Sequence, residues 1–148
     1  MGKKLIIKGA DFSENGIQSE NIVYLTQSMI MSGYDYYIQS GKSVANGTIS
    51  GHELKGGFID ISSYSGYETV LLKKQTSKVI ARIGFVTQLP TAAKQNISFA
   101  TGYSDVITVQ DDDIHEYSLP SNATYLYVMY ENYAGGGNIF PSRLALKE

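Results

Sequence analysis

The stretch from Gly56 to Leu72 constrains the fold of this chain more than any other segment. It reads Gly-Gly-Phe-Ile-Asp-Ile, then Ser-Ser-Tyr-Ser-Gly-Tyr, then Glu-Thr-Val-Leu-Leu. Two sheet-forming runs separated by small polar residues suit an antiparallel sandwich, because pleated strands must turn sharply without burying unpaired backbone. We therefore expect an antiparallel β-sandwich, in which two such sheets pack face to face.

The same pattern continues beyond this stretch. After Gly33 the apolar residues recur with a period close to two, with Gly and Ser at the intervals typical of all-β domains. No long, capped helical pattern interrupts them. The expected strands are residues 34–39, 47–50, 57–61, 68–74, 79–87, 96–100, 105–109, 114–119, 125–131 and 142–146.

One expected strand, residues 125–130, is apolar on both faces. Side chains alternate along a strand, so Leu126 and Val128 share one face while Tyr127 and Met129 share the other. Both faces are apolar enough to need at least partial cover. A neighbouring subunit is one candidate for this cover, and we therefore expect a homo-oligomer.

The amino-terminal part of the chain is expected to form an arm over residues 1–31, leaving residues 32–148 as the sandwich domain. A short β-like run occupies residues 5–7, and turn formers follow it. Between Ser19 and Met31 the apolar spacing fits a helix about as well as a strand, and Ser19 could cap a helix with Glu20 in its first turn. The arm is expected to pack on the sandwich or to join an oligomer.

Composition excludes several classes of function. A chain of 148 residues suits a single domain. With a net charge of -2 there is no excess of basic residues to attract nucleic acid. No cysteine is present, so no thiolate nucleophile or cysteine-based metal site is available. The apolar run at the amino terminus ends at Lys8, too short for a signal-peptide core or a membrane span, so we expect no membrane insertion.

The layout of the strands resembles one known family. The pieces that carry the resemblance are Gly47-Thr48-Ile49-Ser50, Gly57-Phe58-Ile59-Asp60-Ile61-Ser62-Ser63-Tyr64, Arg82-Ile83-Gly84-Phe85 and Leu119-Pro120-Ser121-Asn122-Ala123-Thr124-Tyr125-Leu126. In this order they resemble the galactose-binding-like jelly-roll modules found in gut Bacteroidales and in phage tail or tail-fibre proteins. The likeness covers about two thirds of the chain, from Gly47 to Leu146, and contains no catalytic signature.

The resemblance implies a fold and a class of function. It implies a jelly-roll sandwich whose loops at one end commonly bind carbohydrate or mediate assembly, located outside the cell or on a virion surface. The chain departs from the family after the central strand, where Phe85-Val86-Thr87-Gln88 replaces the frequent aromatic-Asp turn. Ligand contacts supplied by that turn are therefore not expected here.

Tyrosines beside polar loop residues are the candidate ligand-binding groups. A sugar presents an apolar face and a fringe of hydroxyls, so its site needs an exposed ring next to amide or charged groups. Tyr133, Asn132 and Asn138 flank a glycine-rich loop, and Tyr64 and Tyr67 lie in the Ser/Gly corner. The alternative is that these rings pack against strands or between subunits. Arg82 and Arg143 are interpreted as strand-face or interface residues.

The run Asp111-Asp112-Asp113 is the strongest local concentration of oxygen ligands. A structural Ca²⁺ held by Asp111 and Asp113 is one interpretation, because calcium binds six to eight oxygens in loops. The run lacks the alternating spacing and late Glu of a calcium loop, and a solvated turn between two strands is the other interpretation. No other cofactor is expected.

Nothing in the sequence predicts an enzyme. His52 and His115 are the only histidines, and no nucleophile elbow accompanies either of them. Acids are available for the carboxylate pair of a glycosidase, but no pattern pairs them. The expected function is non-catalytic binding or adhesion, with a glycan as ligand, in a surface or tail-like assembly. The alternatives are a structural assembly protein without a small-molecule ligand and, third, a glycoside-active enzyme.

Overall fold

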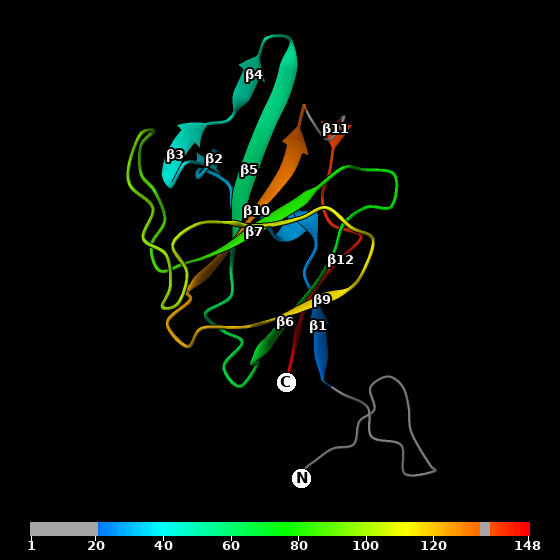
Figure 1. Cartoon of the computed structure of the whole chain (residues 1–148). Helices are drawn as coiled ribbons and strands as arrows, with labels where there is room; N and C mark the ends of the chain where they lie inside the picture. Colours follow the sequence, from blue (N-terminus) through cyan, green and yellow to red (C-terminus); the bar gives the residue numbers. More distant parts are fainter. Residues whose placement is uncertain (1–20, 134–136) are drawn as a thin grey trace, which may run out of the picture.

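The computed structural model describes residues 21–133 and 137–148, and these residues are almost entirely strand and turn (Figure 1). The strands are β1 (Ile22–Tyr24), β2 (Tyr36–Gln39), β3 (Lys42–Ala45), β4 (Gly47–Ile49), β5 (His52–Asp60), β6 (Thr69–Lys73), β7 (Ala81–Val86), β8 (Ile107–Val109), β9 (His115–Ser118), β10 (Tyr125–Asn132), β11 (Gly137–Asn138) and β12 (Arg143–Lys147). A single 3-10 turn, η1, covers Gln27–Met29.

Two antiparallel sheets form the body of the fold. One has four strands in the order β1-β12-β6-β9, and the other has the order β4-β5-β10-β7-β8 with β11 paired to β10. Strands β2 and β3 make a separate hairpin. The predicted all-β antiparallel sandwich is thus confirmed.

The main core lies between the two sheets and is aliphatic and aromatic. Leu126 and Val128 of β10 are fully buried there, as the strand alternation predicts. From the opposite sheet, β6 and β12 contribute Val70, Leu72, Leu144 and Leu146, all at most 2% exposed. Each such side chain stabilises the fold by about 1.5–3 kcal/mol relative to its exposed state.

A second apolar layer covers the outer face of the larger sheet. Phe58 of β5 and Tyr127 and Met129 of β10 point to this face, and Tyr37 and Ile38 of the β2–β3 hairpin pack on them. The cover over the second face of β10 therefore comes from the same chain, and not from the neighbouring subunit that the sequence suggested.

The hairpin is built and attached by specific local features. Ser40 and Gly41 form its two-residue turn with φ of 52° and 74°, which is the left-handed geometry that tight hairpins require. The side-chain amide of Asn46 makes two hydrogen bonds with the backbone of Gly56. Its Nδ2 donates to the carbonyl oxygen at 2.8 Å, and its Oδ1 accepts from the N–H at 2.9 Å. Gly56 has to be glycine, because a Cβ there would lie 2.6 Å from Cε1 of Tyr127 and 2.8 Å from the carbonyl oxygen of Tyr36.

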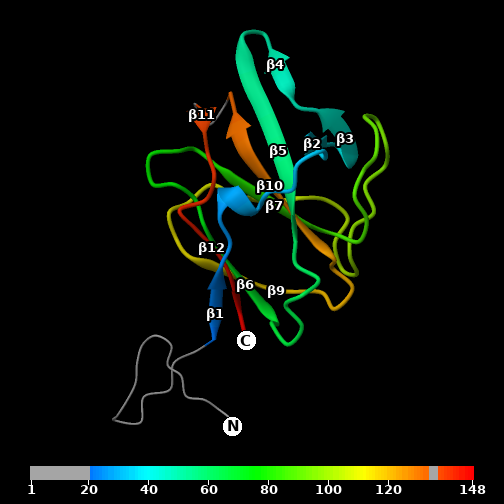
Figure 2. The same cartoon turned by 180° about the vertical axis from the view of Figure 1, so that it is seen from behind.

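The segment expected as an amino-terminal arm contributes, in its described part, to the sandwich. Strand β1 pairs with the carboxyl-terminal β12, as the view from behind shows (Figure 2), and Leu25 is buried in the main core. The open choice between helix and strand is resolved as a short strand followed by η1. Residues 1–20, with the run 5–7 and the cap candidates Ser19 and Glu20, lie outside the described residues.

Three strand predictions need correction. Residues 96–100 form only two isolated bridges, Lys42 to Asn96 and Val86 to Phe99, in place of a strand. Strand β3 was not expected, because its residues are mostly small or polar. Strand β5 begins at His52, well before Gly57, since the two glycines do not break it. No helix in the described parts of the chain is long and apolar enough to cross a membrane.

Candidate functional site: a cleft on the outer sheet face

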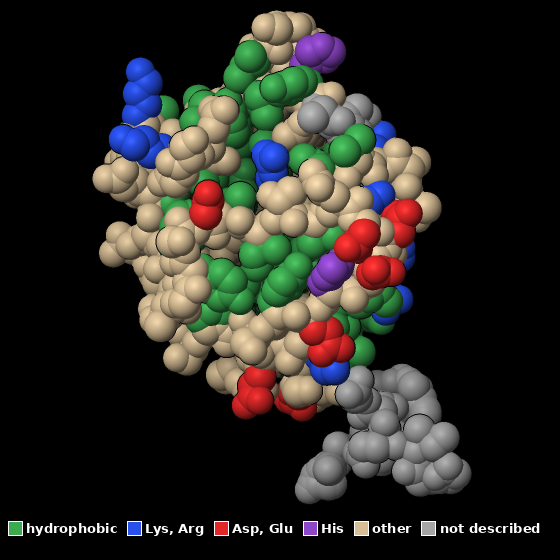
Figure 3. All heavy atoms as spheres, in the orientation of Figure 1, with side chains coloured by type: hydrophobic (Ala, Val, Ile, Leu, Met, Phe, Trp, Pro, Cys, Tyr) green, Lys and Arg blue, Asp and Glu red, His purple; other side chains and the backbone are tan. Residues whose placement is uncertain are grey.

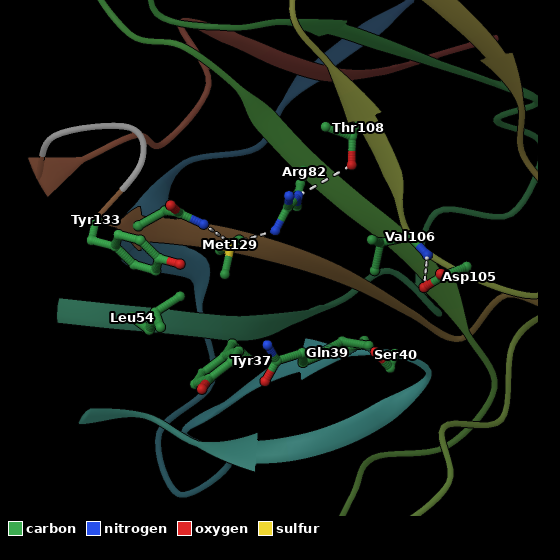
Figure 4. A pocket seen from close by; sticks show the side chains of 12 residues that line it. Tyr37, Gln39, Ser40, Leu54, Arg82, Asp105, Val106, Thr108, Met129 and Tyr133 are labelled. Carbon is green, nitrogen blue, oxygen red and sulfur yellow. Dashed lines mark hydrogen bonds between the residues drawn. The ribbon is translucent and has the colours of Figure 1, made fainter. Parts of the chain in front are cut away.

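A cleft of about 410 Å³ opens on the outer face of the larger sheet, beside the hairpin (Figure 4). Leu54 of β5 and Met129 of β10 form its floor. Gln39 and Ser40 of the hairpin lie along one wall. The other wall comes from β7, β8 and the segment just before β8. The cleft exists because the hairpin covers only part of the apolar outer face.

Tyr133 provides an exposed ring at one end of the cleft. It follows directly after β10 and is 55% exposed, although most tyrosines of this chain are at least half-buried. Its ring packs at a tilt against His52, with the ring centroids 5.6 Å apart. The imidazole thus supports the ring from one side and leaves area free for a ligand.

Arg82 is the cation of the cleft. It lies on β7 between Ala81 and Ile83, which face the main core, so strand alternation directs the arginine to the outer face. Its Nε donates a hydrogen bond to Oγ1 of Thr108 at 3.1 Å, and Nη1 lies 3.9 Å from Sδ of Met129. Within residues 21–133 and 137–148, no carboxylate forms an ion pair with it.

Asp105 is the anion of the cleft, on the segment that precedes β8. Its Oδ1 accepts a hydrogen bond from the backbone N–H of Val106 at 2.7 Å, which fixes the carboxylate in place (Figure 4). The side chain is exposed. The cleft therefore presents a fixed negative charge and a fixed positive charge that do not pair with each other.

Tyr37 adds a buried hydroxyl to the same surroundings. The residue is 1% exposed, and its hydroxyl oxygen has no hydrogen-bond partner among the described residues. Burial raises the pKa of Tyr37, and the nearby Tyr133 raises it further. A buried hydroxyl without a partner is uncommon and costs about 1–3 kcal/mol.

Of the expected glycan-binding residues, the structure brings Tyr133 and Asn132 into the cleft. Asn132 is only 4% exposed, and its Nδ2 donates to Sδ of Met129 at 3.3 Å. It therefore shapes the floor more than it offers a free amide. Asn138 does not line the cleft: its Nδ2 donates to Oε1 of Gln27 at 3.0 Å, and its Oδ1 accepts from the N–H of Phe140 at 2.8 Å.

The other two expected residues, Tyr64 and Tyr67, do not line the cleft. Their rings meet edge to face at a centroid distance of 5.8 Å, and both pack against the main core. Burial raises the pKa of Tyr67, and Glu148 adds to the increase. The structure therefore places these two rings against the main core, as in the alternative in which the rings pack against strands.

The acidic run is a turn held by its own neighbours. Oδ1 of Asp111 bonds Nε2 of His115 at 2.7 Å and accepts from the N–H of Asp113 at 2.9 Å, and Asp112 pairs with Lys74 at 2.8 Å. The hydrogen bond from His115 is the main cause that lowers the pKa of Asp111. The described residues contain no group of three candidate ligands that could hold a metal ion. Among the described residues, Asp111 and Asp113 are thus not joined by a third side chain of this kind that could share a calcium ion with them.

Several cleft residues were missed from the sequence. Arg82 was interpreted as a strand-face residue, and Gln39, Asp105 and Thr108 were not singled out as ligand contacts. Gln39 and Arg82 lie far in sequence from each other and from the neighbouring residues Asp105 and Thr108, so no local motif connects all four. Arg82 did carry a signal, because a lone charged residue within the apolar run 80–86 must face away from the main core.

Comparison of the chain with known protein families, curated proteins and solved structures found no match. The likeness to galactose-binding-like modules therefore remains an expectation from residue patterns.

Proposed function

We propose that this protein is a non-catalytic carbohydrate-binding module and that the cleft on the outer sheet face is its binding site. The observation that carries the proposal is the exposed ring of Tyr133 next to fixed polar groups in one cleft. A sugar needs this combination, since its C–H face packs on an aromatic ring while its hydroxyls exchange hydrogen bonds.

The dimensions and the polar groups of the cleft fit a small saccharide. Its volume of about 410 Å³ lies within the range common for small-molecule sites. A saccharide with one ring on Tyr133 would have Gln39, Ser40 and Asp105 among the polar groups that line the same cleft (Figure 4). Adhesion to a glycan-coated surface, as part of a surface or phage-tail-like assembly, is the context that the resemblance adds.

The carboxylates of the cleft support binding over catalysis. A glycosidase needs one protonated and one ionised carboxyl group on the two sides of the scissile bond. Among the described residues that line the cleft, Asp105 is the sole carboxylate. The proposal is therefore a binding module and not a glycoside-active enzyme.

An assembly role is the second candidate, and one observation favours it. Tyr24 is 56% exposed on β1, which lies at the end of the four-stranded sheet. Edge strands with exposed apolar side chains are common contact sites between chains. Light scattering of the purified chain tests this role, because it requires a defined multimer.

A glycan array followed by calorimetry tests the binding proposal. Tyr133→Ala should weaken binding about tenfold or more, since a lost ring contact of ~1.4 kcal/mol corresponds to that factor. Tyr24→Ala is the matched control, because it removes an equally exposed ring away from the cleft. If no glycan binds, or if Tyr133→Ala binds as tightly as wild type, the binding proposal is wrong and assembly becomes the leading candidate.

A further inference from the structure

We infer that the ligand is an anionic saccharide whose acidic group, a carboxylate or a sulfate, is bound by Arg82. This inference rests on the proposed function and specifies its ligand class. It goes beyond a general sugar site, for which Tyr133 and neutral hydrogen-bonding groups would be enough.

The hydrogen bonds of Arg82 leave part of its guanidinium free. Thr108 occupies Nε, and the sulfur of Met129 is a weak acceptor for Nη1. The side chain reaches from β7 toward Met129 and lines the cleft (Figure 4), where the remaining N–H groups have no other partner among the described residues. A planar guanidinium with free donors binds carboxylate or sulfate oxygens in a two-point geometry.

The surroundings of Arg82 increase the effect of such a pairing. The side chain is only partly exposed and lies against Met129, which is 1% exposed. Charge interactions are stronger where the protein excludes part of the water. Because no described carboxylate neutralises Arg82, an acidic ligand group would supply the missing partner.

Asp105 and Tyr133 indicate that the anion is attached to a sugar. Asp105 faces the same cleft without pairing with Arg82, so it is available to accept hydrogen bonds from hydroxyl groups. A bare inorganic anion would use neither Asp105 nor the exposed ring of Tyr133. A sugar with an acidic group at one position and hydroxyls at others would use all three residues.

The test compares matched oligosaccharides by calorimetry on the full chain. The probes are an oligosaccharide of glucuronic acid, its sulfated neutral-sugar counterpart, the unmodified neutral counterpart and inorganic sulfate. Wild type should bind at least one acidic probe about 10- to 100-fold more tightly than the neutral one, the range expected for hydrogen bonds to a charged group. This preference should decrease as NaCl is raised.

Variants assign the preference to Arg82. Arg82→Gln should remove the preference for acidic probes over the neutral one, while Arg82→Lys should keep part of it, because an ammonium retains the charge without the planar fork. Arg143→Gln is the control, since it removes the same charge from an exposed site on β12. Thr108→Val is a control for local packing. It removes the hydrogen bond from Arg82 on β7 to Thr108 on β8 but keeps the charge of Arg82, so the variant should still clearly prefer acidic probes.

Each outcome is decisive. Equal affinity for neutral and acidic probes, unchanged by Arg82→Gln but reduced by Tyr133→Ala, overturns the anionic ligand and leaves the carbohydrate-binding proposal standing. Inorganic sulfate binding as tightly as the acidic sugars also overturns the inference, because the site would then be a simple anion site. Failure of every saccharide to bind overturns both proposals. The stronger of the two acidic probes identifies the acidic group.

Discussion

The two faces of the larger sheet show two ways of burying the same strands. Toward the main core, β10 presents Leu126 and Val128, which are sealed by the second sheet. Toward the outside it presents Tyr127 and Met129, which are at most 1% exposed, but here Met129 lies against a cleft that opens beside the hairpin. The inner face therefore contributes stability alone, while the outer face combines stability with an opening to solvent.

The difference also appears in the polar atoms. Among the described residues, no buried tyrosine belongs to the main core. The outer layer contains the buried tyrosines Tyr37 and Tyr127, and the buried amide of Asn132 lies beside it. Polar groups at a covered surface need partners, and they can recognise a ligand where those partners are missing. The following experiments test whether the two faces differ in this way.

The largest effect is expected in the main core. Leu126→Ala should lower the free energy of unfolding by about 2–5 kcal/mol, because it leaves a closed cavity between the sheets. Met129→Ala on the other face of the same strand should cost at least ~1 kcal/mol less, because its cavity joins the cleft and can fill with water. Urea unfolding measures both values. Equal costs would mean that the outer layer is sealed as well as the core.

Gly56→Ala should be the next largest perturbation. The added Cβ would lie 2.8 Å from the carbonyl oxygen of Tyr36, which is backbone, so the hairpin itself has to shift. Overpacking of this kind costs about 1–3 kcal/mol. Gly47→Ala is the control, because its Cβ meets nothing within 4 Å. A Gly56→Ala protein as stable as wild type would show that the hairpin is not held tightly on β5.

The two buried tyrosines should respond differently to loss of the hydroxyl. Tyr127 accepts the N–H of Ile38 at 2.9 Å, so Tyr127→Phe leaves a buried donor unpaired and should cost about 1–3 kcal/mol. The Tyr37 hydroxyl has no partner, so Tyr37→Phe should be neutral or stabilising by up to about 1 kcal/mol. Chemical denaturation of both variants gives the comparison. A clear loss of stability for Tyr37→Phe would contradict the unpartnered hydroxyl.

The smallest effect concerns an acid outside both apolar layers. The Ser62 hydroxyl and the Ser62 N–H, at 2.6 and 2.9 Å, lower the pKa of Asp60. Because the folded pKa lies below the unfolded value of about 3.9, the bonds stabilise the fold above that pH, and this contribution is lost as pH falls through the folded pKa. The site is exposed, so Asp60→Asn should change stability by less than about 0.5 kcal/mol at pH 7. Between pH 7 and pH 3 the free energy of unfolding should fall less for Asp60→Asn than for wild type. An equal fall in both proteins would contradict the role of the Ser62 hydrogen bonds.

Period-two patterning was enough to predict the sandwich and the two faces of residues 125–130. It failed where side chains do not alternate by polarity. The β3 run Lys-Ser-Val-Ala is too polar to be recognised as a strand, and Gly56-Gly57 reads as a break although close packing by Tyr127 and Ile30 requires both glycines. Residues 96–100 have the pattern of a strand but form only single bridges.

The cleft was less predictable than the fold. Tyr133 and Asn132 could be found because they adjoin a glycine-rich loop. Arg82, Asp105 and Gln39 could not be grouped, because the sheet order and the position of the hairpin bring them together. Asn138 was misplaced for the same reason: its distance along the chain from Tyr133 is short, but it faces Gln27 and not the cleft.

The Ser40-Gly41 turn of the hairpin has a practical consequence. Ser40 lies at the rim of the cleft, and the Ser50-Gly51 turn repeats its left-handed pair of φ values, 52° and 81°, without lining the cleft. Loops of this type accept exchanges of length and sequence without rearranging the strands that they join. The hairpin tip is therefore a suitable position for introducing new side chains at the cleft. The same changes at Ser50-Gly51 would show how much stability such a turn exchange costs away from the cleft.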